Sequence, residues 1–481
     1  MKASKNPGAA GSSRRDFLGK TAAILAGAAV APAGVNSAAA VPAPAVATAG
    51  RILGANDRAN VAFIGCGMQF LALLGRAFRR RKQEKNDFEY AAVCDVWQPR
   101  LDYAQTQTQA ERTFRDYREV LARPEIDGVV IAVPDHWHYR IASEALHAGK
   151  DVYLEKPLTY TIEEAAKLHD EVAATKRVLQ VGGSGVLDRL NWKIHEYIQA
   201  GKMGKILWGL ISYNRNTREG MWDYPIPGVG STHWPDAKVA PGDNLDWEMW
   251  LGPAPKRPFS AERYFRWRKY WDYSGGNATD LLYHRLGAML TMVGFDFPAR
   301  VTGAGGIYVQ KNREVPDTYM TLVEYPGDFT INMISCMANA SSSPVTVYGN
   351  WGTLEITRSP VPAGDAMGDQ TRGPQTPRER PRTVAVVKAE RTFLKEFQEA
   401  NEGKEEVTID AEDSPDLVDD WLDCMRSRKD PVYNILRGYQ VMVAIKLGVD
   451  SYRQGRVLAF DPKSRQVIYP PERKEYLPAD A

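Results

Sequence analysis

The chain has 481 residues, of which 44% are apolar and 25% are charged. This is ordinary globular composition, and the length is enough for two domains with sizeable cores, so collagenous and coiled-coil classes are excluded. Lysine and arginine (61) nearly balance aspartate and glutamate (59), and the formal net charge of +2 gives no field that would hold the molecule on nucleic acid. We therefore expect small polar partners and no nucleic acid.

The first fifty residues differ in kind from the rest. A basic start leads to the segment SRRDFL at residues 13–18, and an apolar stretch runs from Thr21 to Ala33. That stretch falls short of the roughly 20 residues that span a bilayer, and small-residue cleavage options follow at 38–40 and 47–49. The paired arginines resemble a twin-arginine signal, whose route carries folded proteins across the bacterial inner membrane. We expect residues 1–50 to be this signal and a linker, the mature protein to be periplasmic or otherwise exported, and its chain to have no membrane span. An uncleaved anchor is the alternative.

Strands and helices alternate after the linker. The buried run Val61–Ile64 ends in a Gly-Cys-Gly turn, and a helix should follow through residues 71–78. Further strands are expected at 90–94, 128–133 and 151–154. This alternation predicts a doubly wound parallel sheet, in which ligands bind at the carboxyl ends of the strands. The charge run Arg79–Lys82 is interpreted as a solvated helix end.

From about Gly182 the chain shows longer alternating runs, such as 206–213 and 328–334, which predict an open, mostly antiparallel sheet. Amphipathic helices are expected around 417–425 and 439–447, and 358–382 is interpreted as a surface loop. The predicted fold class is α/β. It comprises an NAD(P)-binding Rossmann domain over 60–181 and a substrate-binding α/β domain over 182–470.

The turn after the first strand suits a dinucleotide. Gly65 and Gly67 allow the backbone to approach a pyrophosphate at a helix N-terminus, although Phe70 replaces the third glycine of the usual motif. Asp95, after the second strand, could accept hydrogen bonds from the adenosine ribose and would repel a 2′-phosphate. This favours NAD over NADP, while Arg100 keeps NADP open. A strand turn that binds no ligand is the alternative.

The segment 135–138, Asp-His-Trp-His, brings two histidines and a carboxylate close together. No further ligand cluster is evident in the sequence, and the segment fits a helix cap beside the nicotinamide pocket. The four cysteines also lack metal-type spacing. We therefore predict no metal site.

Three segments together resemble a known family. Pro134-Asp135-x-x-His138 and the run AGKDVYLEKP at 148–157 are similar to the P-N-x-x-H and A-G-K-x-V-x-x-E-K-P segments of Gfo/Idh/MocA oxidoreductases. The similarity continues through Gly275-Gly276-x-x-x-Asp280-x-x-x-His284. The resemblance implies a catalytic group of Lys156, Asp280 and His284, and an oligomer contact. With the turn residues, it indicates a cofactor site made by Gly65, Gly67, Asp95, Pro134, Asp135, His138, Glu155 and Lys156. Asp135 stands where asparagine is common in the family.

The chemistry of alcohol oxidation fits the same three residues. A base must remove the hydroxyl proton as hydride leaves the carbon, and the neutral imidazole of His284 is the candidate. Lys156 can stabilise the developing negative charge on oxygen. Asp280 precedes His284 by one helical turn, so its carboxylate could orient the imidazole or bind a neighbouring hydroxyl. A surface Asp/His pair without a catalytic role is the alternative.

Aromatic and arginine residues are dense between Trp208 and Trp271. Sugar rings stack on such faces, and arginines bind hydroxyls or carboxylates, so Tyr213, Arg215 and Trp271 are candidate substrate contacts. A role of these aromatics in the core or in an oligomer interface is an equal alternative.

These observations predict an NAD(P)-dependent oxidoreductase acting on a secondary hydroxyl of a sugar or glycoside. Because an exported enzyme would meet no NAD pool, we expect NAD to stay bound and to be recycled within the catalytic cycle. One alternative is an NAD-dependent glycoside hydrolase or lyase that works through a keto-sugar. Another is a non-catalytic sugar-binding protein. A homo-oligomer is expected.

Overall fold

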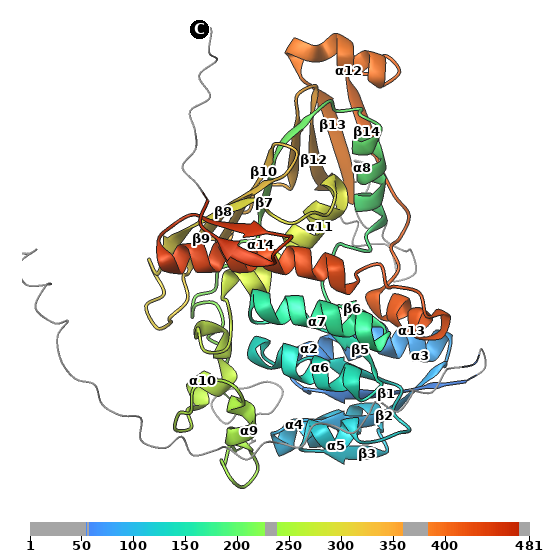
Figure 1. Cartoon of the computed structure of the whole chain (residues 1–481), viewed down its shortest axis with the longest axis vertical. Coiled ribbons are helices and arrows are strands. Elements are labelled where there is room, and N and C mark those ends of the chain that lie inside the picture. Colours follow the sequence, from blue (N-terminus) through green and yellow to red (C-terminus); the bar gives the residue numbers. More distant parts are fainter. Residues whose placement is uncertain (1–53, 55–56, 227–237, 359–382, 471–481) are drawn as a thin grey trace, which may run out of the picture. The chain divides into compact units, whose positions relative to one another are not determined.

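The computed structural model describes residues 54, 57–226, 238–358 and 383–470 (Figure 1). The predicted signal segment 1–50 and nearly all of the predicted loop 358–382 lie outside these residues. No helix in the described ranges is long and apolar enough to cross a membrane.

Six parallel strands form the first sheet, in the order β3-β2-β1-β4-β5-β6. The strands are β1 (Ala59–Ile64), β2 (Phe88–Cys94), β3 (Arg112–Phe114), β4 (Gly128–Ile131), β5 (Asp151–Leu154) and β6 (Leu179–Val181). The order reverses between β1 and β4, which opens a crevice at the carboxyl ends of these two strands. The predicted doubly wound parallel sheet is confirmed.

Helices cover both faces of this sheet, which is why its central strands are apolar without interruption. One face carries α2 (Met68–Leu73), η1 (Leu74–Phe78), α3 (Arg79–Glu84), α4 (Gln98–Thr108) and α13 (Leu417–Ser427). The other carries α5 (Tyr117–Leu121), α6 (His138–His147) and α7 (Ile162–Thr175). Phe70 at the third glycine position is buried, and its ring meets that of Phe63 edge-on at 5.3 Å. An aromatic contact thus replaces the close helix–strand packing that glycine permits.

The second sheet has ten strands in the order β14-β13-β12-β11-β7-β10-β9-β8-β15-β16. These are β7 (Ile206–Ser212), β8 (Arg300–Gly306), β9 (Thr318–Tyr325), β10 (Phe329–Cys336), β11 (Thr346–Gly349), β12 (Gly352–Arg358), β13 (Thr383–Ala389), β14 (Glu406–Ile409), β15 (Leu458–Asp461) and β16 (Gln466–Ile468). β7 and β10 pair in parallel, and the other pairings described in this sheet are antiparallel. The predicted open, mostly antiparallel sheet is confirmed.

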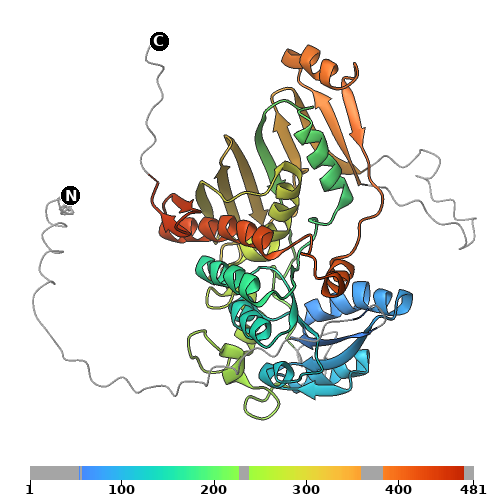
Figure 2. The same ribbon diagram turned by 45° about the vertical axis from the view of Figure 1, so that its right-hand side comes forward.

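Helices on one face of the second sheet join it to the first (Figure 2). They are α8 (Arg189–Gln199), η4 (Ala278–Leu282), α11 (Tyr283–Val293) and α14 (Ile435–Gln454). The α14 helix packs between β8 and α7, which explains why fourteen of its residues are buried. On the other face, alternate residues of β9 reach solvent, with Met320 46% and Leu322 47% exposed.

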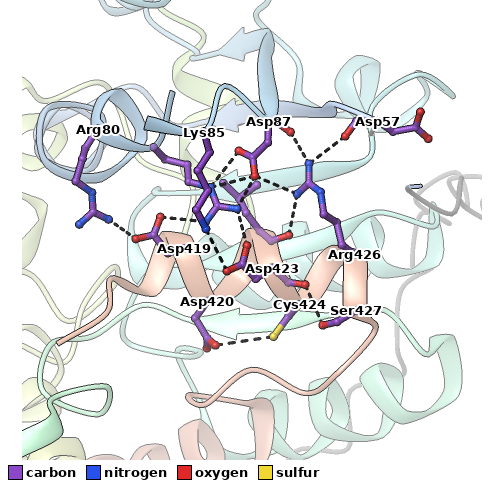
Figure 3. Close-up of polar contacts among 12 residues, drawn as sticks. Asp57, Arg80, Lys85, Asp87, Asp419, Asp420, Asp423, Cys424, Arg426 and Ser427 are labelled. Atoms are coloured by element: carbon purple, nitrogen blue, oxygen red, sulfur yellow. Dashed lines mark hydrogen bonds and ion pairs between the residues drawn. The ribbon is translucent and has the colours of Figure 1, made fainter. Parts of the chain in front are cut away.

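An ionic cluster around the buried Arg81 joins α3 to α13, and we name it the latch cluster: Arg81, Asp87, Asp419 and Asp423. Arg81 is 1% exposed, and its guanidinium lies 2.5 Å from carboxylate oxygens of both Asp87 and Asp423 and 3.3 Å from Asp419. Figure 3 shows Asp419 and Asp423 of α13 on the side of that helix that faces Arg80, Lys85 and Asp87, whereas Asp420 points the other way. The interpretation of 79–82 as a solvated helix end is therefore wrong at Arg81, because acids over 300 residues away neutralise it.

Candidate active site

A cavity of about 510 Å³ lies at the carboxyl edge of the first sheet. Its wall includes Gly65, Gly67, Asp95, Pro134, Asp135, Glu155 and Lys156 from the first sheet's loops, and Tyr213, Arg215, Asp280 and His284 from beyond β6. The size is typical of a site for a small molecule or cofactor. The structure thus gathers most of the predicted site residues in one place.

The turn after β1 is shaped to admit a ligand. Gly65 has φ +89°, and a Cβ there would lie 2.5 Å from the carbonyl oxygen of Ala132, so glycine is required by the protein itself. A Cβ on Gly67 would meet only Arg100, at 3.8 Å. Since the protein does not demand glycine at 67, the open space suits the close approach of a pyrophosphate.

Asp95 is held at the cavity edge by the backbone. Its Oδ2 accepts a hydrogen bond from the Cys66 N–H at 2.8 Å, and its Oδ1 accepts one from the Trp97 N–H at 2.9 Å. Burial raises the pKa of this carboxyl, against the pull of Arg100. Each oxygen keeps a second acceptor site, so the carboxylate fits the ribose hydroxyls of a dinucleotide.

A bridging segment, residues 238–273, crosses the carboxyl edge of the first sheet and contains α9 (Trp247–Leu251), α10 (Ala261–Phe265) and η3 (Trp267–Lys269). The Asn244 carbonyl accepts a hydrogen bond from Gln98 N at 2.9 Å, and the Trp250 carbonyl accepts one from the Trp137 indole at 2.8 Å. The segment also supplies cavity-lining residues: Met249, Trp250, Tyr264, Phe265, Trp267 and Arg268. It therefore covers the crevice where the cofactor is expected.

A second ionic cluster lies in the cavity wall, and we name it the site cluster: Lys156, Asp280, Arg268 and Trp222. Lys156 Nζ donates to Asp280 Oδ1 and to the Asp280 carbonyl, both at 2.8 Å. Arg268 Nε donates to Oδ1 at 2.9 Å, and the Trp222 indole donates to Oδ2 at 3.2 Å. Burial alone would raise the pKa of Asp280, but Lys156 and Arg268 outweigh it and hold that pKa well below its usual range.

His284 follows Asp280 by one helical turn, yet within the described part of the chain no hydrogen bond joins the two side chains. The imidazole is oriented by Ser184, whose backbone N–H donates to Nδ1 at 3.0 Å. Burial, and then the neighbouring Lys156, lowers the pKa of His284 to about 3. The ring is therefore neutral at ordinary pH. The orienting role suggested for Asp280 is not what the structure shows.

Asp135 begins the short helix η2 (Asp135–Trp137), but it does not cap it. Its Oδ2 instead accepts a hydrogen bond from the Thr279 hydroxyl at 3.0 Å. Burial raises the pKa of Asp135 to about 6, against the opposing effect of Arg268 and Lys156. The helix-cap interpretation of this segment is therefore wrong for the Asp135 side chain.

The two histidines of the same segment bind main-chain oxygens. His136 Nε2 lies 3.1 Å from the Trp250 carbonyl, while the His138 nitrogens lie 2.5 and 2.9 Å from the carbonyls of Pro157 and Val133. No three His, Cys, Asp or Glu side chains of the described ranges group closely enough to hold a metal ion. His138, predicted to touch the cofactor, is buried behind the cavity wall and holds the loops after β4 and β5 together.

Two of the three residues predicted to contact the substrate line the cavity, and the third does not. Tyr213 and Arg215 line the cavity, and the Arg215 guanidinium donates a hydrogen bond to the Tyr213 hydroxyl at 2.5 Å. Trp271 does not line it, because its ring packs beside Tyr452 and beneath Arg453. Other aromatics of this region, such as Trp247 and Trp250, are buried in a hydrophobic cluster, as expected if these aromatics belong to the core.

Four residues of the site were not among the predicted site residues: Ser184, Trp222, Arg268 and Thr279. Trp222 and Arg268 belong to the aromatic- and arginine-rich region expected to contact the substrate, and the structure places them instead on Asp280. Thr279 has a local sequence signal, because it directly precedes Asp280 within the Gly275–His284 motif; in the structure both lie on the π-helix η4, a distortion common at functional sites. The other three come from separate loops, and the tertiary fold alone brings them to His284 and Asp280.

Comparison with known proteins agrees with this geometry. Residues 59–183 match the Gfo/Idh/MocA model described as an oxidoreductase family NAD-binding Rossmann fold, and residues 190–326 match the family's C-terminal alpha/beta domain. The fold is similar to that of aldose–aldose oxidoreductase from Caulobacter crescentus complexed with glycerol, with a TM-score of 0.59 and 16% identity over 84% of this chain and all of the other.

Two curated relatives carry glycosidase names. A glycosyl hydrolase family 109 protein of Shewanella baltica is 28% identical over 237 residues, 46% of this chain and 50% of the relative. An alpha-N-acetylgalactosaminidase of Shewanella oneidensis is 26% identical over 288 residues, 52% and 61% of the two chains. The matches thus span only about half of each relative. The two family models, in contrast, cover more than half of this chain, which belongs to the Gfo/Idh/MocA oxidoreductase family and carries its NAD-binding Rossmann domain.

Proposed function

We propose that the protein is an NAD-dependent oxidoreductase that acts on a secondary hydroxyl of a sugar or glycoside. One observation carries this proposal: the glycine turn and Asp95 share a single cavity with Lys156 and His284. Bound NAD supplies the hydride acceptor. The rest of the cavity wall is rich in hydrogen-bonding groups, including Tyr213, Arg215 and Arg268, which suits a polyhydroxylated substrate.

Lys156 is suited to hold the reacting oxygen. Two of the three N–H bonds of its ammonium group are directed to the backbone and side chain of Asp280. The third remains for a ligand in the cavity that Lys156 lines. A cation at this place stabilises negative charge that develops on the substrate oxygen as its proton leaves.

The proposal includes NAD that stays bound and is recycled within the catalytic cycle. Support comes from the bridging segment, which lines the same cavity and is hydrogen-bonded to Gln98 after β2 and to Trp137 after β4. The twin-arginine-like segment at 13–18 supports the same idea, since a folded protein could be exported with its cofactor already in place. Oxidation of one hydroxyl would then be followed by return of the hydride to a second substrate or to the same one.

A second candidate is an NAD-dependent glycoside hydrolase or lyase, in which oxidation acidifies a neighbouring C–H bond and the glycosidic bond is then eliminated. The names of the Shewanella relatives favour it. Net redox change separates the candidates, because cleavage through a keto-sugar leaves the bound cofactor in its starting state, whereas an ordinary dehydrogenase releases one NADH per product.

The deciding experiment examines the purified mature protein. It is denatured before and after incubation with a panel of glycosides that includes an N-acetylgalactosaminide, and the released nucleotide is measured by absorbance and mass. We expect NAD to be retained through purification and to become reduced in place. Activity only with added NAD, and release of one NADH per product in the steady state, would contradict the closed cycle. Bound glycoside with no reduction would favour a non-catalytic sugar-binding protein.

We also propose that the protein is a homo-oligomer, joined through the open face of the second sheet. Trp208, Met320 and Leu322 are 38–47% exposed there, and the Trp208 ring stacks on Tyr348 at 3.7 Å. Apolar side chains on one face of a sheet mark a contact surface. Light scattering of the wild type and of Leu322→Lys tests this; a wild-type monomer would exclude it.

A further inference from the structure

The contact between Ser184 and His284 determines which ring nitrogen carries the proton. A backbone N–H can only donate, so the His284 Nδ1 that receives it at 3.0 Å carries a lone pair. The Ser184 hydroxyl lies 3.2 Å from the same Nδ1 and can donate as well as accept, so it is compatible with that lone pair. The neutral ring must then carry its proton on Nε2. Because His284 lines the cavity and its Nδ1 is occupied by Ser184, the ring offers the substrate a hydrogen-bond donor.

A donor at this place cannot accept the proton that leaves a reacting hydroxyl. Asp280 is also a poor acceptor, because Lys156, Arg268 and Trp222 all donate to its carboxylate. Lys156 is bound to that carboxylate as its ion-pair partner. The site cluster and His284 therefore provide positive charge and N–H groups, and the proton must go to another group.

Besides Asp280, three carboxyls in the described ranges line the cavity. Asp95 accepts two backbone N–H groups, Glu155 accepts Gln69 Nε2 at 2.9 Å and the Lys156 N–H at 3.3 Å, and Asp135 has the fewest partners.

Asp135 is 4% exposed, and within the described residues its side chain receives a hydrogen bond from Thr279 alone, at Oδ2. The Gly275 N–H donates to the same Thr279 oxygen at 3.1 Å. Of the two acceptors within reach of the Thr279 hydroxyl, Asp135 Oδ2 at 3.0 Å is nearer than the Gly276 carbonyl at 3.4 Å. Oδ1 is left to accept a proton from the cavity.

The charges around Asp135 come from three other elements. Arg268 and Lys156 favour its ionised form, Asp280 opposes it, and Tyr160 is a further titratable neighbour. Burial outweighs the two cations and raises the pKa of Asp135 to about 6. A carboxylate with that pKa is ionised at neutral pH and still basic enough to take a proton.

We infer that Asp135 is the proton-accepting group of this site and that His284, locked by Ser184, donates a hydrogen bond to the reacting oxygen. The inference rests on the proposed alcohol oxidation. The substrate carbon gives up hydride to the bound cofactor, the O–H bond breaks, and its proton passes to Asp135 as the C=O bond forms. The carbonyl oxygen is then held by His284 Nε2–H and Lys156. In the return step, Asp135 gives the proton back as the carbon regains hydride.

The first test is Asp135→Asn, which keeps the shape of the side chain and its hydrogen bond with Thr279 but cannot take up a proton. The rate at which a glycoside reduces the bound cofactor is followed in a single turnover from pH 4 to 8. In the wild type, the rate should fall as the pH drops through about 6. In the variant it should be lower by about 10²–10⁴-fold and should lose that acid limb. The inference would be overturned if the rate of the variant is within threefold of the wild-type rate and still falls as the pH drops through about 6.

The second test needs no turnover. Nitrogen-15 spectra of histidine-labelled protein, with the His284 signal assigned by its loss in His284→Asn, should show a protonated Nε2 and an unprotonated Nδ1 between pH 5 and 8. Carbon-13 spectra of the aspartate carboxyls, with Asp135 assigned in the same way, should show it titrating near 6. Asp317, whose pKa the N–H groups of residues 308–310 hold below its usual range despite burial, is the internal reference.

A proton on Nδ1, or an Asp135 signal that titrates at or below the ordinary aspartate range, would overturn the inference. The two tests also separate it from the proposed function. If no glycoside reduces the cofactor, the proposed function fails, whereas the protonation states of His284 and Asp135 are still decided by their spectra.

Discussion

The latch cluster and the site cluster are both groups of ions centred on one side chain, but the central side chain has opposite charge in the two clusters. In the latch cluster the buried cation Arg81 meets three carboxylates. The same acids also pair with the more exposed Arg80, Lys85 and Arg426. In the site cluster one carboxylate, Asp280, meets Lys156, Arg268 and the Trp222 indole. Both join segments that lie far apart in sequence.

The two clusters also differ in whether a hydrogen-bond donor remains for a ligand. The guanidinium of Arg81 is enclosed by its acids between two helices, away from the cavity. Lys156 and Arg268 line the cavity, and Lys156 keeps an N–H bond beyond those that it gives to Asp280. A buried ion pair that is complete holds a fold together, whereas one with spare donors beside a cavity is prepared for a ligand. Three predictions follow, from the largest effect to the smallest.

Lys156→Met should lower the rate of glycoside-dependent cofactor reduction by about 10³-fold or more, because the reacting oxygen loses its cation. The unfolding free energy should also fall, because Asp280 loses one of its two cations, but Arg268 and Trp222 still bind it and the protein should stay folded. Lys150→Met is the matched control: Lys150 is also buried, but it donates to the carbonyls of Arg123 and Ile126 away from the cavity. Its rate per folded molecule should equal that of the wild type, and an equal loss in both variants would contradict the site role of Lys156.

Arg81→Met should lower the unfolding free energy by about 2–3 kcal/mol, because three acids lose their buried partner while Arg80, Lys85 and Arg426 still pair with them. Cofactor reduction per folded molecule should not change. Arg80→Met is the control, since Arg80 pairs with the same Asp419 but is 39% exposed, and its loss should cost less than about 1 kcal/mol. Urea unfolding measures both, and similar losses would show that burial does not distinguish the two arginines.

Asp87 of the latch cluster and Asp135, which lines the same cavity as the site cluster without belonging to it, should respond to pH with opposite sign. Although burial opposes it, Arg81 lowers the pKa of Asp87, so the stability that this pair contributes is present above about pH 4 and is lost as the pH falls through the folded-state pKa. Asp135 has a raised pKa of about 6, so the folded protein binds a proton that the unfolded chain has released. Its contribution is therefore present below about pH 4 and is lost as the pH rises to 6.

Unfolding of cofactor-free protein at several pH values measures this contrast. The advantage of Asp135→Asn over the wild type should grow between pH 4 and 6 by on the order of 2 kcal/mol and then stay constant. The deficit of Asp87→Asn should instead shrink as the pH falls below 4. A flat difference for Asp135→Asn would contradict its raised pKa.

Much of the fold could be predicted from the sequence because it depends on short-range patterns. The continuous apolar runs of β1, β4 and β5 identify strands covered on both faces, and the alternation in β7 and β10 identifies a sheet with one open face. Gly65, Lys156, Asp280 and His284 were also identified from local motifs, because each follows a strand end or lies on one helix face.

The sequence by itself therefore determined the family, the two sheets and the residues that could carry chemistry. Only the tertiary structure decided what those residues touch. Arg81 looked like part of a solvated helix end until α13 brought acids from the far end of the chain to it. Ser184 gives His284 its tautomer from 100 residues away, and Thr279 reaches Asp135 across 144. Hydrogen bonds and burial act through space, so protonation states follow from packing and not from motifs.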